Sequence, residues 1–321
     1  ITGILSFFIS PIADNLTTAL IMCAVVMAVG KNNSKFIGLA CINIVVCANA
    51  GGAFSPFGDI TTLMVWQKGV VSFSEFFYIF VPSVVNAIIP AVIMHFAISN
   101  DKPAASKEKV TVKKGGYTII GLFLGTITFT VIQHQFLHLP PVFGMMTGLG
   151  VFSIYGYFLK KKEHKDKSNT KVFDIFNKVS KAEWDTLFFF YGVLMCVGGL
   201  SAFGYMSLTA AYMYGDLGAS TANILVGILS AIVDNIPVMF AVLTMLPDMD
   251  LGQWLLVTLT AGVGGSMLSI GSAAGVALMG QTKGIYTFFF HLKWTPVIAL
   301  GYAASILVHF LWNANLFNGI A

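Results

Sequence analysis

The stretch S-P-I-A-D-N-L-T-T, from Ser10 to Thr18, places an aspartate and an asparagine in the middle of apolar sequence. Nearly the same pattern, S-A-I-V-D-N-I-P-V, returns from Ser230 to Val238. Each copy is followed by a glycine-rich interruption of a hydrophobic segment, G-G-A-F-S-P-F-G-D at 51–59 and G-G-S-M-L-S-I-G-S at 264–272. A carboxylate-bearing break followed by a broken helix, present twice, is typical of transporters built from two structural repeats.

The composition is that of a membrane protein. Of the 321 residues, 56% are hydrophobic and only 10% are charged, and the mean hydropathy is +0.81, whereas soluble domains carry about 25% charged residues. Long apolar runs separated by short polar loops predict an all-α polytopic protein of the lipid bilayer. The net charge of +4 gives no support for nucleic-acid binding, because membrane proteins place lysines according to topology.

The apolar runs predict the following segments. Two re-entrant helical hairpins are expected at 1–30 and 219–246, broken at their Asp-Asn pairs. Two transmembrane helices are expected to unwind at their glycine-rich stretches, because glycine and proline oppose a regular helix. Full spans are expected at 76–99, 115–136, 141–159, 184–207 and 294–312.

These segments divide the chain into three parts. A first repeat core occupies 1–99, connecting spans and a basic loop occupy 100–181, and a second core occupies 182–321. Because Ile1 already lies within the first repeat, we expect that a preceding segment is missing from this sequence.

The lysines predict the orientation of the two copies. The basic loops at 31–35, 102–114 and 160–181, together with Lys283, belong on the cytoplasmic side under the positive-inside rule. With these loops inside, the first hairpin enters from the cytoplasm and the second enters from the opposite side. The two copies are then inverted relative to each other, as in transporters that work by alternating access.

Several polar residues fall within the apolar runs. An ionisable side chain at membrane depth costs at least about 2.5 kcal/mol, so it indicates a functional site. No lysine lies near a break and the chain contains no arginine, so an anion site lacks the usual positive partner. Carboxylates, amides, hydroxyls and freed carbonyls are hard oxygen ligands that suit Na⁺ or Li⁺. The candidates for such a site are Asp14, Asn15, Asn49, Asp59, Thr61, Thr62, Asp185, Ser230, Asp234, Asn235, Ser269 and Ser272.

Three of these aspartates suit cation/proton exchange. Desolvation disfavours the charged form of a carboxyl group, and neighbouring carboxylates oppose each other's ionisation. Asp14, Asp59 and Asp234 are therefore expected to hold either protons or a metal ion, Na⁺ or Li⁺, but not both at once.

Structural interpretations of the same residues remain open. Asp14 and Asp234 also fit surface loops, and Asp59 also fits a helix N-cap. Asp185 fits a first-turn acid at the membrane edge, while Ser269 and Ser272 fit small-residue helix packing. The six histidines are expected near span ends, at a surface or interface.

The motifs D-N-L-T-T, G-G-A-F-S-P-F-G-D-I-T-T and S-x-x-x-D-N with G-G-S-M-L-S-I-G-S resemble those of the NhaD-type sodium/proton antiporters. These belong to a wider ion transporter superfamily with dicarboxylate and arsenite carriers. The resemblance extends over essentially the whole chain and implies two opposed hairpins, two broken helices, a homodimer and a multi-pass location in a bacterial inner membrane. It implies functional roles for Ser10 and for each of the twelve candidates named above, including Asp185.

The leading hypothesis is a Na⁺ (or Li⁺)/H⁺ antiporter that works by alternating access, which is not an enzyme and has no cofactor. A Na⁺-coupled carrier of anions with the same fold remains an alternative. Asp-Asn replaces the Ser-Asn-Thr found at the hairpin tips of carboxylate-transporting relatives, and this favours cation exchange. A third hypothesis is an intramembrane aspartyl protease using Gly58-Asp59, but it requires two carboxyls about 3 Å apart, and the repeat gives no reason for such a pair.

Overall fold

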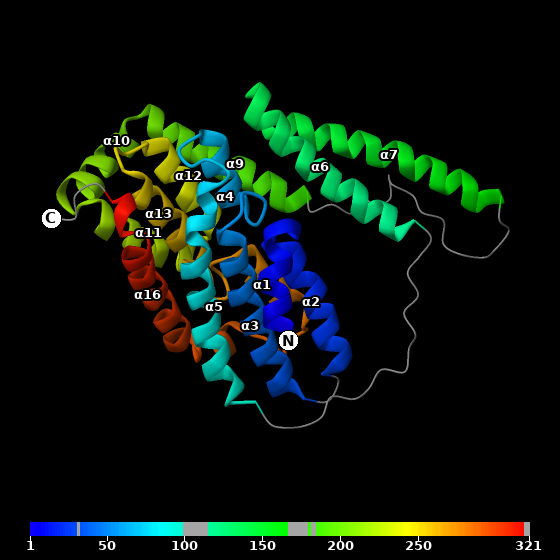
Figure 1. The fold of residues 1–321 in the computed structure, drawn as a ribbon. Coiled ribbons are helices and arrows are strands. Elements are labelled where there is room, and N and C mark those ends of the chain that lie inside the picture. The colour runs from blue at the N-terminus through cyan, green and yellow to red at the C-terminus, as the bar shows by residue number, and fades with distance from the viewer. Residues whose placement is uncertain (31–32, 99–114, 166–178, 181–183, 318–321) are drawn as a thin grey trace. The chain divides into compact units, whose positions relative to one another are not determined.

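The computed structural model describes residues 1–30, 33–98, 115–165, 179–180 and 184–317, apart from the side chains of 162–165 and 185–186. Within these ranges all regular structure is helical (Figure 1). The chain forms two compact units, one of residues 107–189 and one that combines 1–106 with 190–321.

The first segment of the larger unit begins with two helices that meet at Asp14 and continues with a helix broken at 54–59. Its helices are α1 (Thr2–Ala13), α2 (Asn15–Val29), α3 (Ser34–Ala53), α4 (Ile60–Lys68), the 3₁₀ turn η1 (Glu75–Ile79) and α5 (Phe80–His95).

The second segment repeats this order, with two helices that meet at Asp234 and a helix broken at 265–272. It is preceded by α9 (Trp184–Ala202), α10 (Tyr205–Ala210) and the π-helical turn η2 (Ala211–Asp216). Its helices are α11 (Ala219–Val233), α12 (Asn235–Met245), α13 (Leu251–Gly264), α14 (Ala273–Gln281), α15 (Phe288–Leu292), α16 (Thr295–Trp312) and the turn η3 (Ala314–Leu316).

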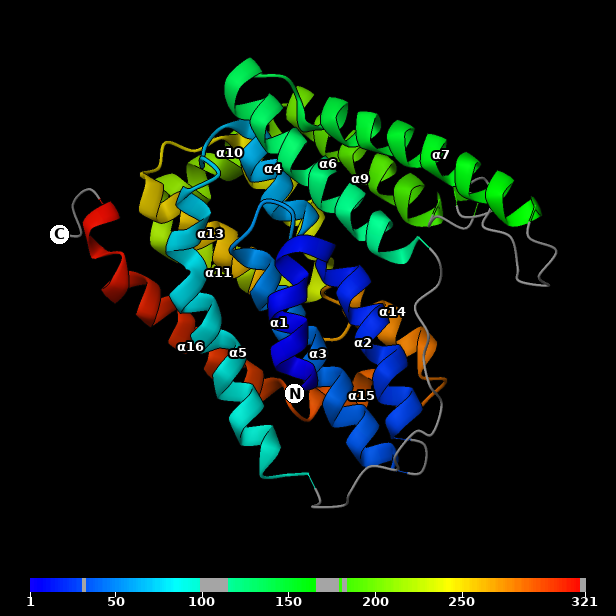
Figure 2. The same cartoon turned by 45° about the vertical axis from the view of Figure 1, so that its right-hand side comes forward.

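Matching helices of the two segments pack in matching ways. Helix α1 packs on α3 and α11 packs on α13, while α5 packs along α16. Helices of one segment also contact helices of the other, because α2 lies against α14 (Figure 2) and α12 lies against α4. Helices α3 and α13 contact each other and are almost entirely buried, so they form the core on which both pairs of short helices rest.

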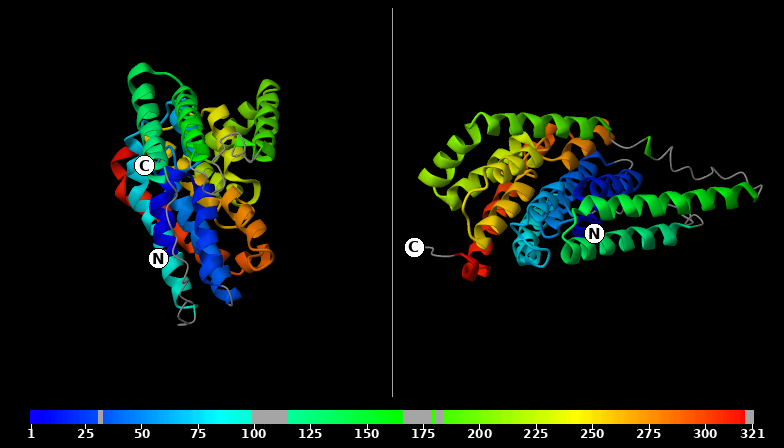
Figure 3. Two further views of the ribbon diagram at one scale, coloured as in Figure 1. Left: turned by 90° about the vertical axis from the view of Figure 1, so that its right-hand side faces the viewer. Right: turned by 90° about the horizontal axis from the view of Figure 1, so that it is seen from above.

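The smaller unit is a hairpin of α6 (Gly116–Leu137) and α7 (Pro141–Lys165), which lie side by side (Figure 3). The close approach depends on small residues. A Cβ atom at Gly144 would meet Thr130, and one at Gly148 would meet Thr126. Such small-residue contacts are the usual means by which apolar helices pack in a bilayer.

Among the described residues, five helices are long and apolar enough to cross a membrane, or six if the bent pair of α9 with α10 and η2 is counted as one span. A bilayer core is about 30 Å thick and requires about 20 apolar residues. The expected class, an all-α polytopic membrane protein, is therefore confirmed. The paired helices at the Asp-Asn breaks have 11 to 15 residues each and are too short to span the core alone.

Two expected boundaries are wrong. Helix α3 does not unwind at Gly51 but continues to Ala53. A Cβ atom at Gly51 would run into the backbone of Phe7 on α1, so this glycine permits close packing and does not end the helix. The single span expected at 184–207 also bends by 83° after Ala202, at Gly204, whose φ of 82° lies in the left-handed region.

Candidate functional site

The two Asp-Asn breaks have the same backbone conformation. Asp14 has φ 67° and ψ 152°, and Asp234 has φ 73° and ψ 146°. Glycine normally occupies this region, and another residue there carries about 1–3 kcal/mol of strain. The chain therefore holds an aspartate twice at a position where glycine would be more stable, which indicates a requirement for the carboxylate itself.

The two helix breaks also match. Asp59 has φ −153° and ψ 152° and caps α4, while Ser272 has φ −149° and ψ 147° and caps α14. The Asp59 carboxylate accepts a hydrogen bond of 2.9 Å from the Thr61 backbone N–H, and the Thr62 hydroxyl donates to the backbone oxygens of Ser55 and Asp59 at 2.7 and 2.8 Å. The N-cap interpretation of Asp59 is thus confirmed, and it leaves the second carboxylate oxygen, Oδ2, available to other partners.

Both hairpin tips meet at that second oxygen. The amide of Asn15 donates to Asp59 Oδ2 at 2.6 Å, and the amide of Asn235 donates to the same atom at 2.7 Å. Asp59 is only 4% exposed. Hydrogen bonds to a charged acceptor are roughly twice as strong as neutral ones, so this carboxylate joins the tips of both segments through strong hydrogen bonds.

Asn49 connects this carboxylate to the second broken helix. Its side-chain oxygen accepts from Asn15 at 2.9 Å. Its amide nitrogen donates to the hydroxyls of Ser266 at 2.9 Å and Ser272 at 3.1 Å. Ser266 was not among the candidates, although it lies in the G-G-S-M-L-S-I-G-S motif that identified its neighbours.

Ser10 and Ser230 have equivalent roles. The hydroxyl of Ser10 donates to the Ala48 carbonyl at 2.6 Å, and that of Ser230 donates to the Ala261 carbonyl at 2.7 Å. Each bond attaches the first helix of a hairpin to the broken helix of the same segment. These serines therefore fix the hairpins beside the site.

Four buried oxygens near the breaks have no hydrogen-bond partner among the described residues. They are Thr18 Oγ1, Thr61 Oγ1, Asp234 Oδ1 and Ser269 Oγ. A buried polar atom without a partner costs about 1–3 kcal/mol, so such atoms are uncommon in stable cores. Hydroxyl and carboxylate oxygens with free lone pairs are suitable ligands for a small cation.

The three aspartates are not equivalent. Asp14 and Asp234 are half-buried, and Asp14 accepts from Thr17 of its own helix at 3.4 Å. Among the described residues, no three His, Cys, Asp or Glu side chains converge closely enough to hold a metal ion. A shared Na⁺ site of Asp14, Asp59 and Asp234 therefore stays a prediction, and Asp59 is the one that both tips contact. Asp185 lies in α9, but its side chain is outside the described residues.

The histidines differ from expectation. His291 and His309 are fully buried, so their expected placement at a surface is wrong. Each is held by a backbone carbonyl, Ser266 O for His291 at 2.9 Å and Gly252 O for His309 at 3.0 Å. These hydrogen bonds compensate for burial of the rings, and no sequence pattern indicated them.

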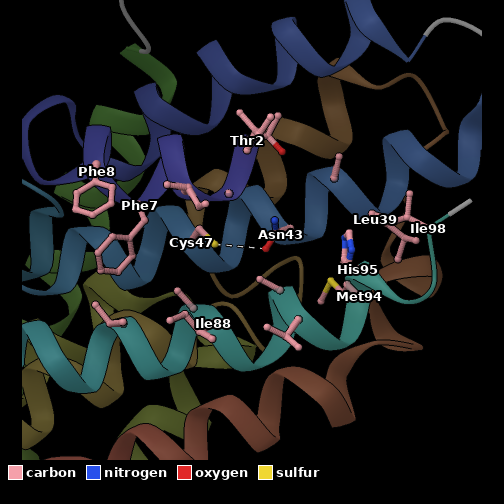
Figure 4. Close-up of a pocket in the computed structure, with 18 of the residues that line it drawn as sticks. Thr2, Phe7, Phe8, Leu39, Asn43, Cys47, Ile88, Met94, His95 and Ile98 are labelled. Carbon is pink, nitrogen blue, oxygen red and sulfur yellow. Dashed lines mark hydrogen bonds between the residues drawn. The ribbon is translucent and has the colours of Figure 1, made fainter. Parts of the chain in front are cut away.

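An apolar cavity of about 610 Å³ lies among α1, α3 and α5 (Figure 4). Phe7, Leu39 and Ile88 are among its lining residues, and Asn43 bonds to Cys47 within it. None of the candidate polar residues with a described side chain lines this cavity, so it is separate from the polar cluster.

The apolar spans and the polar cluster at two matching helix breaks define a polytopic helical membrane protein of the transporter class. Residues 1–262 match the family model CitMHS, described as "Citrate transporter". The chain is 57% identical to the Na⁺/H⁺ antiporter NhaD of Alkalimonas amylolytica, over 99% of this chain and 70% of that protein.

Two further relatives are also named as sodium/proton antiporters. The chain is 60% identical to NhaD of Vibrio parahaemolyticus, over 94% of this chain and 78% of that protein. It is 33% identical to sodium/proton antiporter 1 of Arabidopsis thaliana, over 96% of this chain and 54% of that protein. The chain therefore belongs to the NhaD-type sodium/proton antiporter family, and the resemblance seen in its motifs is confirmed.

Proposed function

We propose that this protein exchanges Na⁺ or Li⁺ for H⁺ across a bacterial inner membrane. The observation that carries the proposal is the meeting of both Asp-Asn tips, through Asn15 and Asn235, at the single buried carboxylate of Asp59. The relatives named Na⁺/H⁺ antiporters support the same activity.

The chemistry follows from competition for one carboxylate. A proton neutralises Asp59 directly, whereas Na⁺ or Li⁺ requires oxygen ligands around it. The side chains of Asn15 and Asn235 each carry an amide oxygen as well as the nitrogen that bonds Asp59. When a cation replaces the proton, these amides rotate to present oxygen, and the hydroxyls of Thr61 and Ser269 complete the ligand set.

Asp14 and Asp234 provide further negative charge at the two tips, where each takes up a proton or contributes to cation binding. The strained backbone at both positions supports a functional requirement for the carboxylates. Asn49, Thr62, Ser230 and Ser272 maintain the spacing of the site through their hydrogen bonds, and Asp185 is assigned a supporting role from the family resemblance.

The two segments act as an inverted repeat of two re-entrant hairpins and two broken transmembrane helices. This is supported by the matching backbone angles at the tips and caps. The lysine-rich loops support opposite orientations. Cores at 1–99 and 182–321, joined by 100–181, then expose the site to one side at a time, and the protein works as a homodimer.

A Na⁺-coupled anion carrier is the second candidate, favoured by the match to a family model described as "Citrate transporter". The site itself argues against it. All 18 basic residues are lysines, and none falls in the motif stretches that build the cluster. A citrate site would require positive charge or several free helix N-termini.

The test uses pH-dye fluorescence in inside-out membrane vesicles that contain the full protein. We expect Na⁺ or Li⁺, but not K⁺, to dissipate an imposed proton gradient, and Asp59→Asn to abolish this response. Asp248→Asn, at an exposed loop aspartate, is the matched control. Proton movement that is insensitive to Na⁺ and Li⁺, together with Na⁺-driven citrate uptake, would refute cation exchange and support the anion carrier.

A further inference from the structure

The loop between α13 and α14, residues 265–272, is held by residues of α15 and α16, which follow it in the chain. The ring of His291 on α15 bonds the Ser266 carbonyl at 2.9 Å. The hydroxyl of Thr295, at the start of α16, bonds the Met267 carbonyl at 2.7 Å. The matching loop at 54–59 is held differently, by the Thr62 hydroxyl on the Ser55 carbonyl and by the Ser55 hydroxyl on the Pro11 carbonyl of α1. The second loop therefore depends on α15 and α16 for its position.

The hydrogen bonds of His291 define one ring state. A carbonyl oxygen only accepts, so Nε2, which faces Ser266 O, carries the hydrogen. The other nitrogen, Nδ1, lies 2.7 Å from the Tyr286 hydroxyl, which donates to it in the neutral ring. His291 is 0% exposed and Tyr286 is 1% exposed. Both ring nitrogens are thus satisfied by fixed partners, which orients the Nε2–H group toward the loop.

Ser266 is where this support reaches the polar cluster. Its carbonyl accepts from His291, and its hydroxyl accepts from Asn49 at 2.9 Å. Asn49 in turn accepts from Asn15, which bonds Asp59. A displacement of the Ser266 backbone would therefore move the hydroxyl that fixes the Asn49 amide, and through it the amide of Asn15.

We propose that His291, oriented by Tyr286, is a positioning residue of the cation site, which it acts on through Ser266 and Asn49. The inference rests on the proposed cation exchange at Asp59. In this proposal His291 does not contact the ion. Its contribution is to set the spacing of the amide oxygens, and hence the affinity for the cation and the discrimination between Li⁺ and Na⁺.

The experiment compares wild type, His291→Leu, His291→Gln and Tyr286→Phe by the half-saturating Na⁺ and Li⁺ concentrations for exchange in vesicles. His309→Leu is the matched control, because His309 is equally buried and also bonds a backbone carbonyl, that of Gly252, away from the cluster. Melting temperatures of all variants in detergent show which substitutions act only through folding.

We expect His291→Leu to raise the half-saturating Na⁺ concentration about tenfold, which corresponds to loss of one hydrogen bond of about 1.4 kcal/mol. The maximal rate per folded molecule stays within about twofold, and the Li⁺/Na⁺ ratio of half-saturating concentrations changes. Glutamine keeps an N–H donor near the position of Nε2, so His291→Gln recovers most of the affinity. Tyr286→Phe, which preserves the shape of the ring, shifts affinity in the same direction by about threefold.

Three results would overturn the inference. One is an unchanged Na⁺ affinity in His291→Leu, and another is an equal shift in His309→Leu. If His291→Leu does not fold, the third result decides instead: an unchanged Li⁺/Na⁺ ratio of half-saturating concentrations in Tyr286→Phe. Absence of Na⁺- or Li⁺-dependent exchange in wild type is a different result, because it refutes the proposed function itself, and the inference with it.

Discussion

The hydrogen bonds at Asp59 predict that the two tip asparagines contribute unequally to stability. Asn15→Ala removes two bonds, one to the Asp59 carboxylate and one to the Asn49 oxygen. Among the described residues, the bond to Asp59 is the one that Asn235→Ala removes. A hydrogen bond to a charged group contributes about 1.5–3 kcal/mol and a neutral one about 0.5–1.5 kcal/mol. Both variants lose the first contribution, and Asn15→Ala loses the second as well.

The difference in stability between the two variants is larger than the contribution of one neutral hydrogen bond. Asn49 is fully buried, so Asn15→Ala leaves its side-chain oxygen without this partner, and an unsatisfied buried acceptor costs about 1–3 kcal/mol. We therefore expect Asn15→Ala to be less stable than Asn235→Ala by at least about 1 kcal/mol. For a unit of this size that corresponds to a difference of about 2–4 °C in melting temperature.

The assay is thermal unfolding of the detergent-solubilised protein, followed by near-ultraviolet circular dichroism and by a thiol-reactive dye. Thr209→Ala is the control, because its exposed hydroxyl bonds only a carbonyl of its own helix. Melting temperatures for Asn235→Ala equal to or below those for Asn15→Ala would refute the assignment of hydrogen bonds around Asp59.

Three further predictions concern packing, capping and strain. Gly51→Ala places a Cβ atom against the backbone of Phe7 and should greatly reduce the yield of folded protein in size-exclusion chromatography, whereas Gly125→Ala, with open space around it, should not. Thr62→Val removes the hydroxyl bonds to Ser55 and Asp59 and should lower the free energy of unfolding by about 1–2 kcal/mol in denaturant titrations; no loss would show that the 54–59 loop is fixed by other contacts. Asp14→Gly relieves about 1–3 kcal/mol of backbone strain and loses about 1 kcal/mol to chain entropy, so it should melt no lower than wild type while losing exchange in vesicles, and a clear fall in melting temperature would contradict the strain at Asp14.

The sequence predicted those parts of the fold that local residue chemistry determines. Apolar runs predicted the spans, and the Asp-Asn pairs predicted where the short helices meet. The glycine-rich stretches predicted the helix breaks, but not their boundaries. A glycine in a helix can either let the helix unwind or let another helix pack closely against it. The contact with Phe7 on α1 shows that Gly51 permits close packing.

The features of the site that the sequence did not reveal depend on contacts between residues far apart in the chain. Ser266 becomes part of the cluster because Asn49, 217 positions away, donates to it. His291 is buried because Tyr286 and the Ser266 carbonyl satisfy its ring. The Ser266 carbonyl lies 25 positions away, and nothing in the local sequence indicates that the Tyr286 hydroxyl turns toward the ring, so the histidine was expected at a surface.

The two segments have nearly the same backbone angles at their tips and caps but differ in side chains. This difference explains why the helix cap of only one segment carries a buried carboxylate. When the two glycine-rich motifs are aligned, Asp59 corresponds to Ser272 and Asn49 corresponds to Gly262. Asp59 and Ser272 have nearly the same backbone angles and both cap a helix. Only the first carries a carboxylate, and it receives the asparagines of both tips. Two symmetric carboxylates would place two charges in the core at several kcal/mol each. One carboxylate contacted by both tips gives a single polar site to which both hairpins are bonded, and this arrangement suits the proposed exchange of one cation for another by alternating access.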